Sequence, residues 1–127
     1  MKKGATYMAT WNLQGTKHHV LICNGASCMR KGGEEVTQAI RDEIDRLQLH
    51  EHVHTTRTRC NGRCEDACVV IVYPEGVWYR TIDEQVARDI VRKHVGDGEV
   101  LHEYVTYTYD EGFVMPEYSV ATRGKEK

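Results

Sequence analysis

The strongest constraint on the fold is an apolar run that continues into a tight turn, "CVVIVYPEGVWYR", at residues 68 to 80. Residues 68 to 73 and 77 to 80 are rich in the β-branched and aromatic side chains that strands favour. Pro74, Glu75 and Gly76 between them have the composition of a turn. The segment therefore predicts a β-hairpin near the middle of the chain. Because a bilayer span takes about 20 apolar residues, we expect no membrane insertion.

Two strands and a helix are predicted before the hairpin. "HHVLIC", at 18 to 23, alternates as a strand does, and "HVHTTRTR", at 52 to 59, is typical of a strand with one exposed face. Between them, apolar residues recur at helical spacing from Glu34 to about Leu47. Residues 24 to 33 contain Asn-Gly and Gly-Gly steps and predict a loop.

A second helix is predicted after the hairpin. Thr81 and Glu84 have the spacing of a capping box, and Val86 and Ile90 continue a helical pattern that Gly96 is placed to end. The order of elements is then strand, helix, strand, hairpin, helix. It predicts an α/β fold in which two main helices pack on a four-stranded mixed sheet.

The chain of 127 residues has the size of one domain. We interpret residues 1–17 as an N-terminal arm, 18–96 as the folded domain and 97–127 as a C-terminal extension. The extension alternates in "EYVTYTY" and again around "FVMPEYSV", which indicates an added hairpin or a segment that a partner orders.

The charge pattern and the N-terminus limit the partners and the compartment. A net charge of −2, with acidic and basic residues interspersed, lacks the basic surface typical of nucleic-acid binders, so we expect no nucleic acid. The first residues lack the continuous apolar region of a signal peptide. We therefore expect a cytoplasmic protein.

The cysteines are the clearest functional signal. In a reducing compartment, an odd number, five, favours metal or redox chemistry over structural disulfides. Cys23 and Cys28 form one local pair, and Cys60 and Cys64 form a second about thirty residues later. Loops that follow two parallel strands lie at the same end of a sheet, so the pairs can meet. Four thiolates suit a structural zinc ion or an iron–sulfur cluster, and their spacing alone does not choose.

The fifth cysteine and the histidines have simpler interpretations. Cys68 begins a predicted strand and is expected to be a packed or semi-buried thiol, with ligand exchange or redox activity as alternatives. His50, His52 and His54 are more typical of a polar strand face than of a metal site. The chain has no CxxC pair, which disfavours a thiol–disulfide oxidoreductase, and no recognisable catalytic arrangement, so we expect no enzymatic activity.

Basic residues flank the four proposed ligands, and this positive charge would favour reduction of an anionic cluster and steer an acidic redox partner. The alternative is that these side chains are merely solvated. The residues are Arg30, Lys31, Arg57, Arg59 and Arg63.

Together, "HVLIC", "CNGASCMRKGGEEV", "RCNGRC" and "VVIVYPEGVWY" followed by a helix resemble the thioredoxin-like [2Fe-2S] ferredoxins. The resemblance covers residues 18 to about 96. The same cysteine plan occurs in a relative of these ferredoxins, the small iron–sulfur subunit of respiratory NADH dehydrogenase. The resemblance therefore implies a thioredoxin-like fold.

The resemblance also implies a [2Fe-2S] cluster ligated by Cys23, Cys28, Cys60 and Cys64, a one-electron carrier that serves a redox enzyme partner, and a homodimer. Some similar ferredoxins are associated with cobalamin biosynthesis, which makes a tetrapyrrole-pathway enzyme one candidate client among other redox enzymes. A structural zinc-binding interaction module and a cluster-holding assembly or sensor protein are the alternatives.

Overall fold

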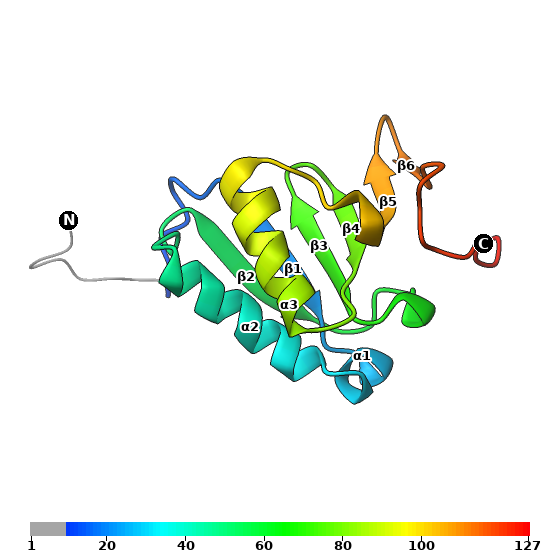
Figure 1. Cartoon of the computed structure of the whole chain (residues 1–127), viewed down its shortest axis with the longest axis horizontal. Coiled ribbons are helices and arrows are strands. Elements are labelled where there is room, and N and C mark those ends of the chain that lie inside the picture. The colour runs from blue at the N-terminus through cyan, green and yellow to red at the C-terminus, as the bar shows by residue number, and fades with distance from the viewer. Residues whose placement is uncertain (1–9) are drawn as a thin grey trace, which may run out of the picture.

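A six-stranded mixed sheet crosses the computed structural model, which describes residues 10 to 127 (Figure 1). The strand order is β2-β1-β3-β4-β5-β6, and β1 and β2 are parallel whereas the other neighbours are antiparallel. The strands are β1 (His18–Cys23), β2 (Val53–Thr58), β3 (Val69–Tyr73), β4 (Val77–Arg80), β5 (Val105–Tyr109) and β6 (Phe113–Val114).

The two longer helical segments lie side by side on one face of the sheet (Figure 1). Helix α2 (Gly33–Arg46) connects the parallel strands β1 and β2, and α3 (Glu84–Asp89) continues as the π-helix η2 (Ile90–Val95). A short helix, α1 (Ala26–Arg30), and two 3₁₀ turns, η1 (Cys64–Asp66) and η3 (His102–Tyr104), complete the fold. None of the helices within residues 10 to 127 is both long and apolar enough for a membrane span.

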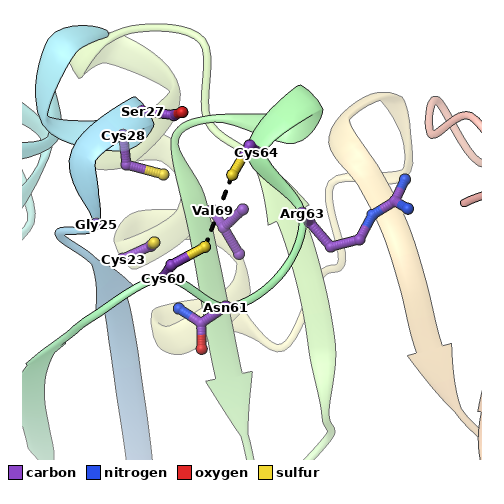
Figure 2. A pocket seen from close by; sticks show the side chains of 9 residues that line it. All are labelled: Cys23, Gly25, Ser27, Cys28, Cys60, Asn61, Arg63, Cys64 and Val69. Carbon is purple, nitrogen blue, oxygen red and sulfur yellow. Dashed lines mark hydrogen bonds between the residues drawn. The ribbon is translucent and has the colours of Figure 1, made fainter. Parts of the chain in front are cut away.

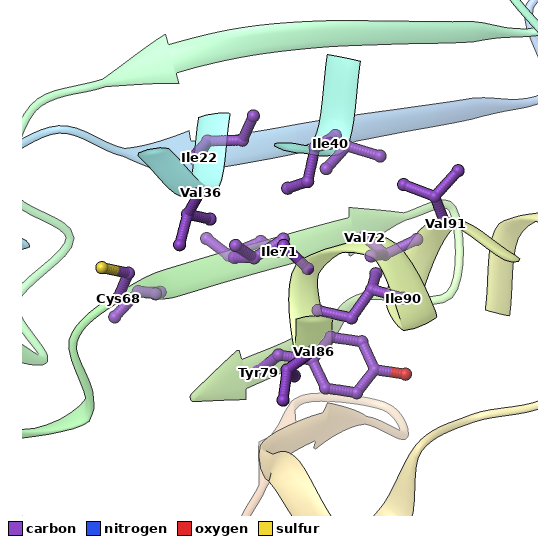
Figure 3. Close-up of a cluster of buried hydrophobic side chains, with 14 of the residues drawn as sticks. Ile22, Val36, Ile40, Cys68, Ile71, Val72, Tyr79, Val86, Ile90 and Val91 are labelled. Atoms are coloured by element: carbon purple, nitrogen blue, oxygen red, sulfur yellow. The ribbon is translucent and has the colours of Figure 1, made fainter. Parts of the chain in front are cut away.

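The core lies between this helical layer and the sheet (Figure 3). Strand β3 is apolar along nearly its whole length because it is central in the sheet, with β1 on one side and β4 on the other. Burial of these apolar side chains is the main force that holds the layers together. The side chains come from β1 (Val20, Ile22), β3 (Val70, Val72), α2 (Val36, Ile40, Ile44) and the second helical segment (Val86, Ile90, Val91).

The structure confirms the mixed α/β class with two main helices, but the predicted count of four strands is wrong. Strand β5 pairs with β4, through Tyr79 and Val105, and β6 pairs with β5. Val105 is fully buried. The extension thus forms the hairpin that its alternation indicated, and this hairpin lengthens the sheet. Residues 1–9 of the predicted arm lie outside the described residues, and the proposed domain limits stay a prediction.

Three local predictions are wrong. Residues 26–30, expected in a loop, form helix α1. Asp83, and not Thr81, caps α3: its Oδ1 accepts from Val86 N at 2.9 Å, because the Thr81 backbone still pairs with Cys68. Helical backbone continues beyond η2 through Gly96, the predicted end, as far as Asp97, and Gly98, whose φ of +76° lies in the left-handed region, follows it.

A buried polar network lies at the end of the sheet where β1 begins. The backbone N–H of Leu101 donates to Tyr79 Oη (3.1 Å), which leaves the Tyr79 hydroxyl to donate to Nδ1 of His94 (2.8 Å). Nε2 of His94 then carries the proton and donates to Glu75 (3.2 Å), whose other oxygen lies 3.4 Å from Nε2 of His18. Both ring nitrogens of His94 therefore have a hydrogen-bond partner inside the fold.

We expect His94 to make folding stability pH-dependent. Burial lowers the pKa of His94 below its ordinary value of 6.5, against an opposing effect of Glu75 and a smaller lowering effect of His18. Below about pH 6.5 the unfolded chain gains a proton that folded His94 does not, so stability should fall with pH at up to about 1.4 kcal/mol per unit. This loss ends below the lowered folded pKa.

Urea unfolding of the wild type and of His94→Gln between pH 5 and 7.5 would measure this slope. In the variant, the slope of the unfolding free energy with pH should be smaller by the contribution of one proton, up to about 1.4 kcal/mol per unit. Exposed His102→Gln serves as the matched control and should keep it. Equal slopes in all three proteins would contradict the assignment.

Candidate functional site

The four cysteines of the two pairs line one pocket at the end of the sheet where β1 finishes (Figure 2). Cys23 is the last residue of β1 and Cys28 lies in α1. Cys60 lies in the loop after β2, and Cys64 begins η1. The pocket between them has a volume of about 10 Å³. The structure thus brings together all four residues that the sequence singled out.

The parallel pairing of β1 and β2 explains this convergence. Cys23 stands opposite Thr58 in the register, and Asn24 N donates to Thr58 O at 2.8 Å, so the two loops leave the sheet side by side. Gly25 lies directly against the second loop: a Cβ at this position would sit 2.8 Å from Cα of Cys60. The absence of a side chain at Gly25 therefore sets how closely the two pairs approach.

The spacing of the second pair suits two ligands of one metal ion. The sulfur atoms of Cys60 and Cys64 are 3.6 Å apart (Figure 2). Two thiolates at about 2.3 Å from one tetrahedral iron or zinc ion would be separated by about 3.8 Å. Among the described residues, no three His, Cys, Asp or Glu side chains are grouped as ligands of a single ion. The Cys60–Cys64 pair thus has the spacing of two ligands of one metal atom, and Cys23 and Cys28 line the same pocket.

The pocket has a buried side and an exposed side. Cys23 and Cys28 are each only 2% exposed, whereas Cys60 and Cys64 are exposed. A group held by all four sulfurs would rest against the core on one side and face solvent on the other. The loop of Cys60 and Cys64 therefore forms the solvent-facing edge of the pocket.

Backbone N–H groups are positioned to stabilise negative charge on the sulfurs. Gly62 N donates to Cys60 Sγ at 3.3 Å. The backbone N–H groups of Gly25 and Asn61 donate to the Cys23 sulfur and lower its pKa, against the larger raising effect of burial. Such hydrogen bonds to cluster sulfurs are one of the factors that set reduction potential.

The inner pair is protonated in the absence of a metal. Burial raises the pKa of Cys23. The pKa of Cys28 is raised further, first by a hydrogen bond with the Cys68 side chain and then by burial. Metal ligation must displace these protons, so binding is favoured as pH rises.

Cys68 is fully buried, which confirms the expectation of a packed thiol. Its sulfur lies within hydrogen-bond distance of the carbonyl oxygens of Cys28 (3.4 Å) and Lys31 (3.3 Å). Cys68 contacts the backbone of the segment that carries Cys28 and does not line the pocket. Its position supports the loop that carries Cys28.

The flanking basic residues are partly engaged by other groups. Arg57 pairs with Glu34 at 3.1 Å, and Arg63 pairs with buried Asp66 at 2.8 Å. Arg30 donates to Ser27. These contacts reduce the free positive charge beside the cysteines, so the predicted effect on potential rests chiefly on Lys31 and Arg59, whose side chains form no ion pair with the described residues.

Two further residues shape the site, and sequence patterns did not identify either role. Gly25 sets the contact between the loops, and Arg63 reaches away from the pocket to the carbonyl of Thr122 at 2.6 Å. An Asn-Gly step predicts only a turn, and nothing local links position 63 to a residue 59 positions later. Both roles depend on contacts between distant segments.

Comparisons with known proteins agree with this geometry. The family described as "Thioredoxin-like [2Fe-2S] ferredoxin" matches residues 4–94. A Priestia megaterium protein whose name places it among the 2Fe-2S ferredoxins is 60% identical, with 94% of each chain covered. "Ferredoxin, 2Fe-2S" of Clostridium pasteurianum is 34% identical over 67% of this chain and 91% of its own length.

The fold has a close counterpart among solved structures. A thioredoxin-like [2Fe-2S] ferredoxin from Aquifex aeolicus superimposes with a TM-score of 0.68 and 31% sequence identity, over 75% of this chain and 94% of the other. The thioredoxin-like fold is therefore confirmed. The agreement of sequence, fold and cysteine geometry shows that the chain belongs to the thioredoxin-like [2Fe-2S] ferredoxin family of electron carriers.

Proposed function

We propose that Cys23, Cys28, Cys60 and Cys64 hold one [2Fe-2S] cluster and that the protein passes single electrons to or from a redox enzyme. The observation that carries this proposal is the convergence of four thiols from two loops on one pocket that is buried on the Cys23 side and exposed on the Cys60 side. The cluster would supply the one-electron chemistry, and this chain's own residues hold and shield it.

The surrounding residues have separable roles in this function. The core side of the pocket excludes water from the inner pair, and the N–H groups of Gly25, Asn61 and Gly62 stabilise thiolate charge. Because Cys60 and Cys64 are exposed, an electron would leave or enter over a short path through their loop.

An absorption spectrum of anaerobically purified protein, before and after dithionite, tests the proposal, with iron, sulfide and zinc counted on the same sample. We expect a coloured protein with about two irons and two sulfides per chain that bleaches on reduction. A colourless protein with about one zinc per chain, which iron and sulfide fail to reconstitute, would favour the structural module instead. Cluster loss in place of reversible bleaching would favour an assembly or sensor role.

We also propose that the protein is cytoplasmic and that a separate redox enzyme, and not this chain, performs the catalysis. In addition, we propose that two copies of the chain form a homodimer. Support for the dimer comes from the sheet face opposite α2 and α3, which no described helix covers (Figure 1). Partly buried apolar side chains, Leu21 and Tyr73, pack at the margin of the core. Sedimentation at micromolar concentration should give about twice the 14.6 kDa of one chain. A tetrapyrrole-pathway enzyme is one candidate partner.

A further inference from the structure

The C-terminal extension packs beside the loop that carries Cys60 and Cys64. The family match ends at residue 94, yet β5 continues the sheet by pairing with β4. The end of the chain then returns to the cysteine loop, where Thr122 O accepts from Arg63 Nη2 at 2.6 Å. The extension is therefore joined both to the sheet and to the loop at the exposed edge of the site.

Arg63 is the residue that joins the two parts. Its Nε pairs with Asp66 (2.8 Å), which is only 2% exposed, and its guanidinium carbon lies 5.3 Å from the ring centre of Tyr107 on β5. A Cβ at Gly124 would lie 2.8 Å from Nη1 of Arg63, so the tail passes in close contact. Arg63 is thus held by an ion pair with Asp66 inside the loop, and its contacts with Tyr107 and Thr122 tie the loop to the extension.

A groove of about 810 Å³ lies between this loop and the extension. Its floor is aromatic: the ring of Trp78 meets those of Tyr107 and Phe113 edge to face, with ring centres 6.5 and 5.6 Å apart. Phe113 is 52% exposed. Asn61 and Arg63 line both this groove and the cysteine pocket, so an occupant of the groove would touch the loop of Cys60 and Cys64.

The rim of the groove is basic. Its cations are Arg63, Arg123, Lys125 and Lys127, and its acids are Glu65 and Glu126. Arg63 is paired with Asp66 and Arg123 with Glu126, so the charges of the rim that form no ion pair with the described residues are Lys125, Lys127 and Glu65. They leave a local excess of one positive charge, in a chain whose formal net charge is −2. This local charge favours an acidic occupant over a basic one.

We propose that this groove is the docking site for an acidic segment of the redox partner protein, which places an apolar or aromatic side chain on the Phe113 floor. The proposal rests on the electron-carrier function and adds to it the chemistry of the partner surface. Docking here would bring the partner to the exposed side of the cysteine site. The extension would then determine which partners this ferredoxin serves.

Stopped-flow electron transfer from the dithionite-reduced holoprotein to an acidic cytochrome b5 domain and to basic cytochrome c tests this proposal. Lys125→Glu/Lys127→Glu should lower the second-order rate toward the acidic cytochrome about tenfold at low ionic strength, and the loss should disappear at high salt. The same double variant should raise the rate toward cytochrome c. Phe113→Ala should slow transfer to the acidic cytochrome at high salt as well.

A matched control is Lys17→Glu/Lys93→Glu, which changes net charge equally at the end of the sheet opposite the cysteines. Its rates should change less than twofold. Equal slowing by both double variants would mean that only net charge matters, and a change of dimer mass in Lys125→Glu/Lys127→Glu would make the groove a contact between copies. Either result overturns the proposal. A wild type that bleaches reversibly but reduces neither cytochrome would instead overturn the electron-carrier function on which it rests.

Discussion

Replacing Cys64 with alanine is expected to remove nearly all the cluster, to less than about a tenth of the wild-type iron per chain. With one of four thiolates absent, an iron would lose a ligand on the solvent side, where water can enter. The side chain is exposed, so the fold itself should lose little stability. The measurement is iron and sulfide content with the visible spectrum after identical anaerobic reconstitution.

Cys68→Ala is the matched control for this loss. Because Cys68 is buried behind the loop and does not line the pocket, this variant should keep its cluster. Removing a buried sulfur should instead cost about 1–2 kcal/mol of folding stability. Cluster loss in Cys68→Ala as severe as in Cys64→Ala would show that the ligand assignment is wrong.

The second large effect is expected at Gly25. A methyl group there would stand 2.8 to 3.0 Å from backbone atoms and Cβ of Cys60, so the two cysteine loops must separate. Overpacking of this kind costs about 1–3 kcal/mol. Because the separation falls between the two cysteine pairs, we expect Gly25→Ala to lower cluster content and to speed cluster loss several-fold.

Thermal unfolding and the rate of bleaching by an iron chelator would measure both effects of Gly25→Ala. Gly96→Ala is its control, since Gly96 has helical backbone angles and a Cβ there would lie 3.4 Å from the carbonyl oxygen of Val91, an ordinary contact. That variant should be as stable as the wild type or slightly more so. A Gly25→Ala protein that matched this control in both assays would mean that the loops do not need their close contact.

The strands and helices that local periodicity specifies were predictable. The alternation at residues 18 to 23 and the apolar run before Pro74 correspond to β1 and β3, and the helical spacing after Glu34 corresponds to α2. Each depends on one face of a segment being buried, and that requirement appears in the order of apolar and polar residues. Errors arose where a position had competing local roles, as at Thr81, whose backbone extends the β3-β4 ladder and so is not available as a helix cap.

By itself, the sequence determined the class of fold, the two pairs of cysteines and the resemblance that identifies the family, because residue order and spacing carry that information directly. Only the tertiary structure decided that Gly25 allows the two loops to pack closely, that Cys68 supports the loop of Cys28 and that Arg63 joins the extension to the site. These three roles are contacts between segments about 35 to 60 residues apart in the chain. No local pattern records such contacts, because they exist only once the parallel pairing of β1 with β2 and the added strand β5 have brought the segments together.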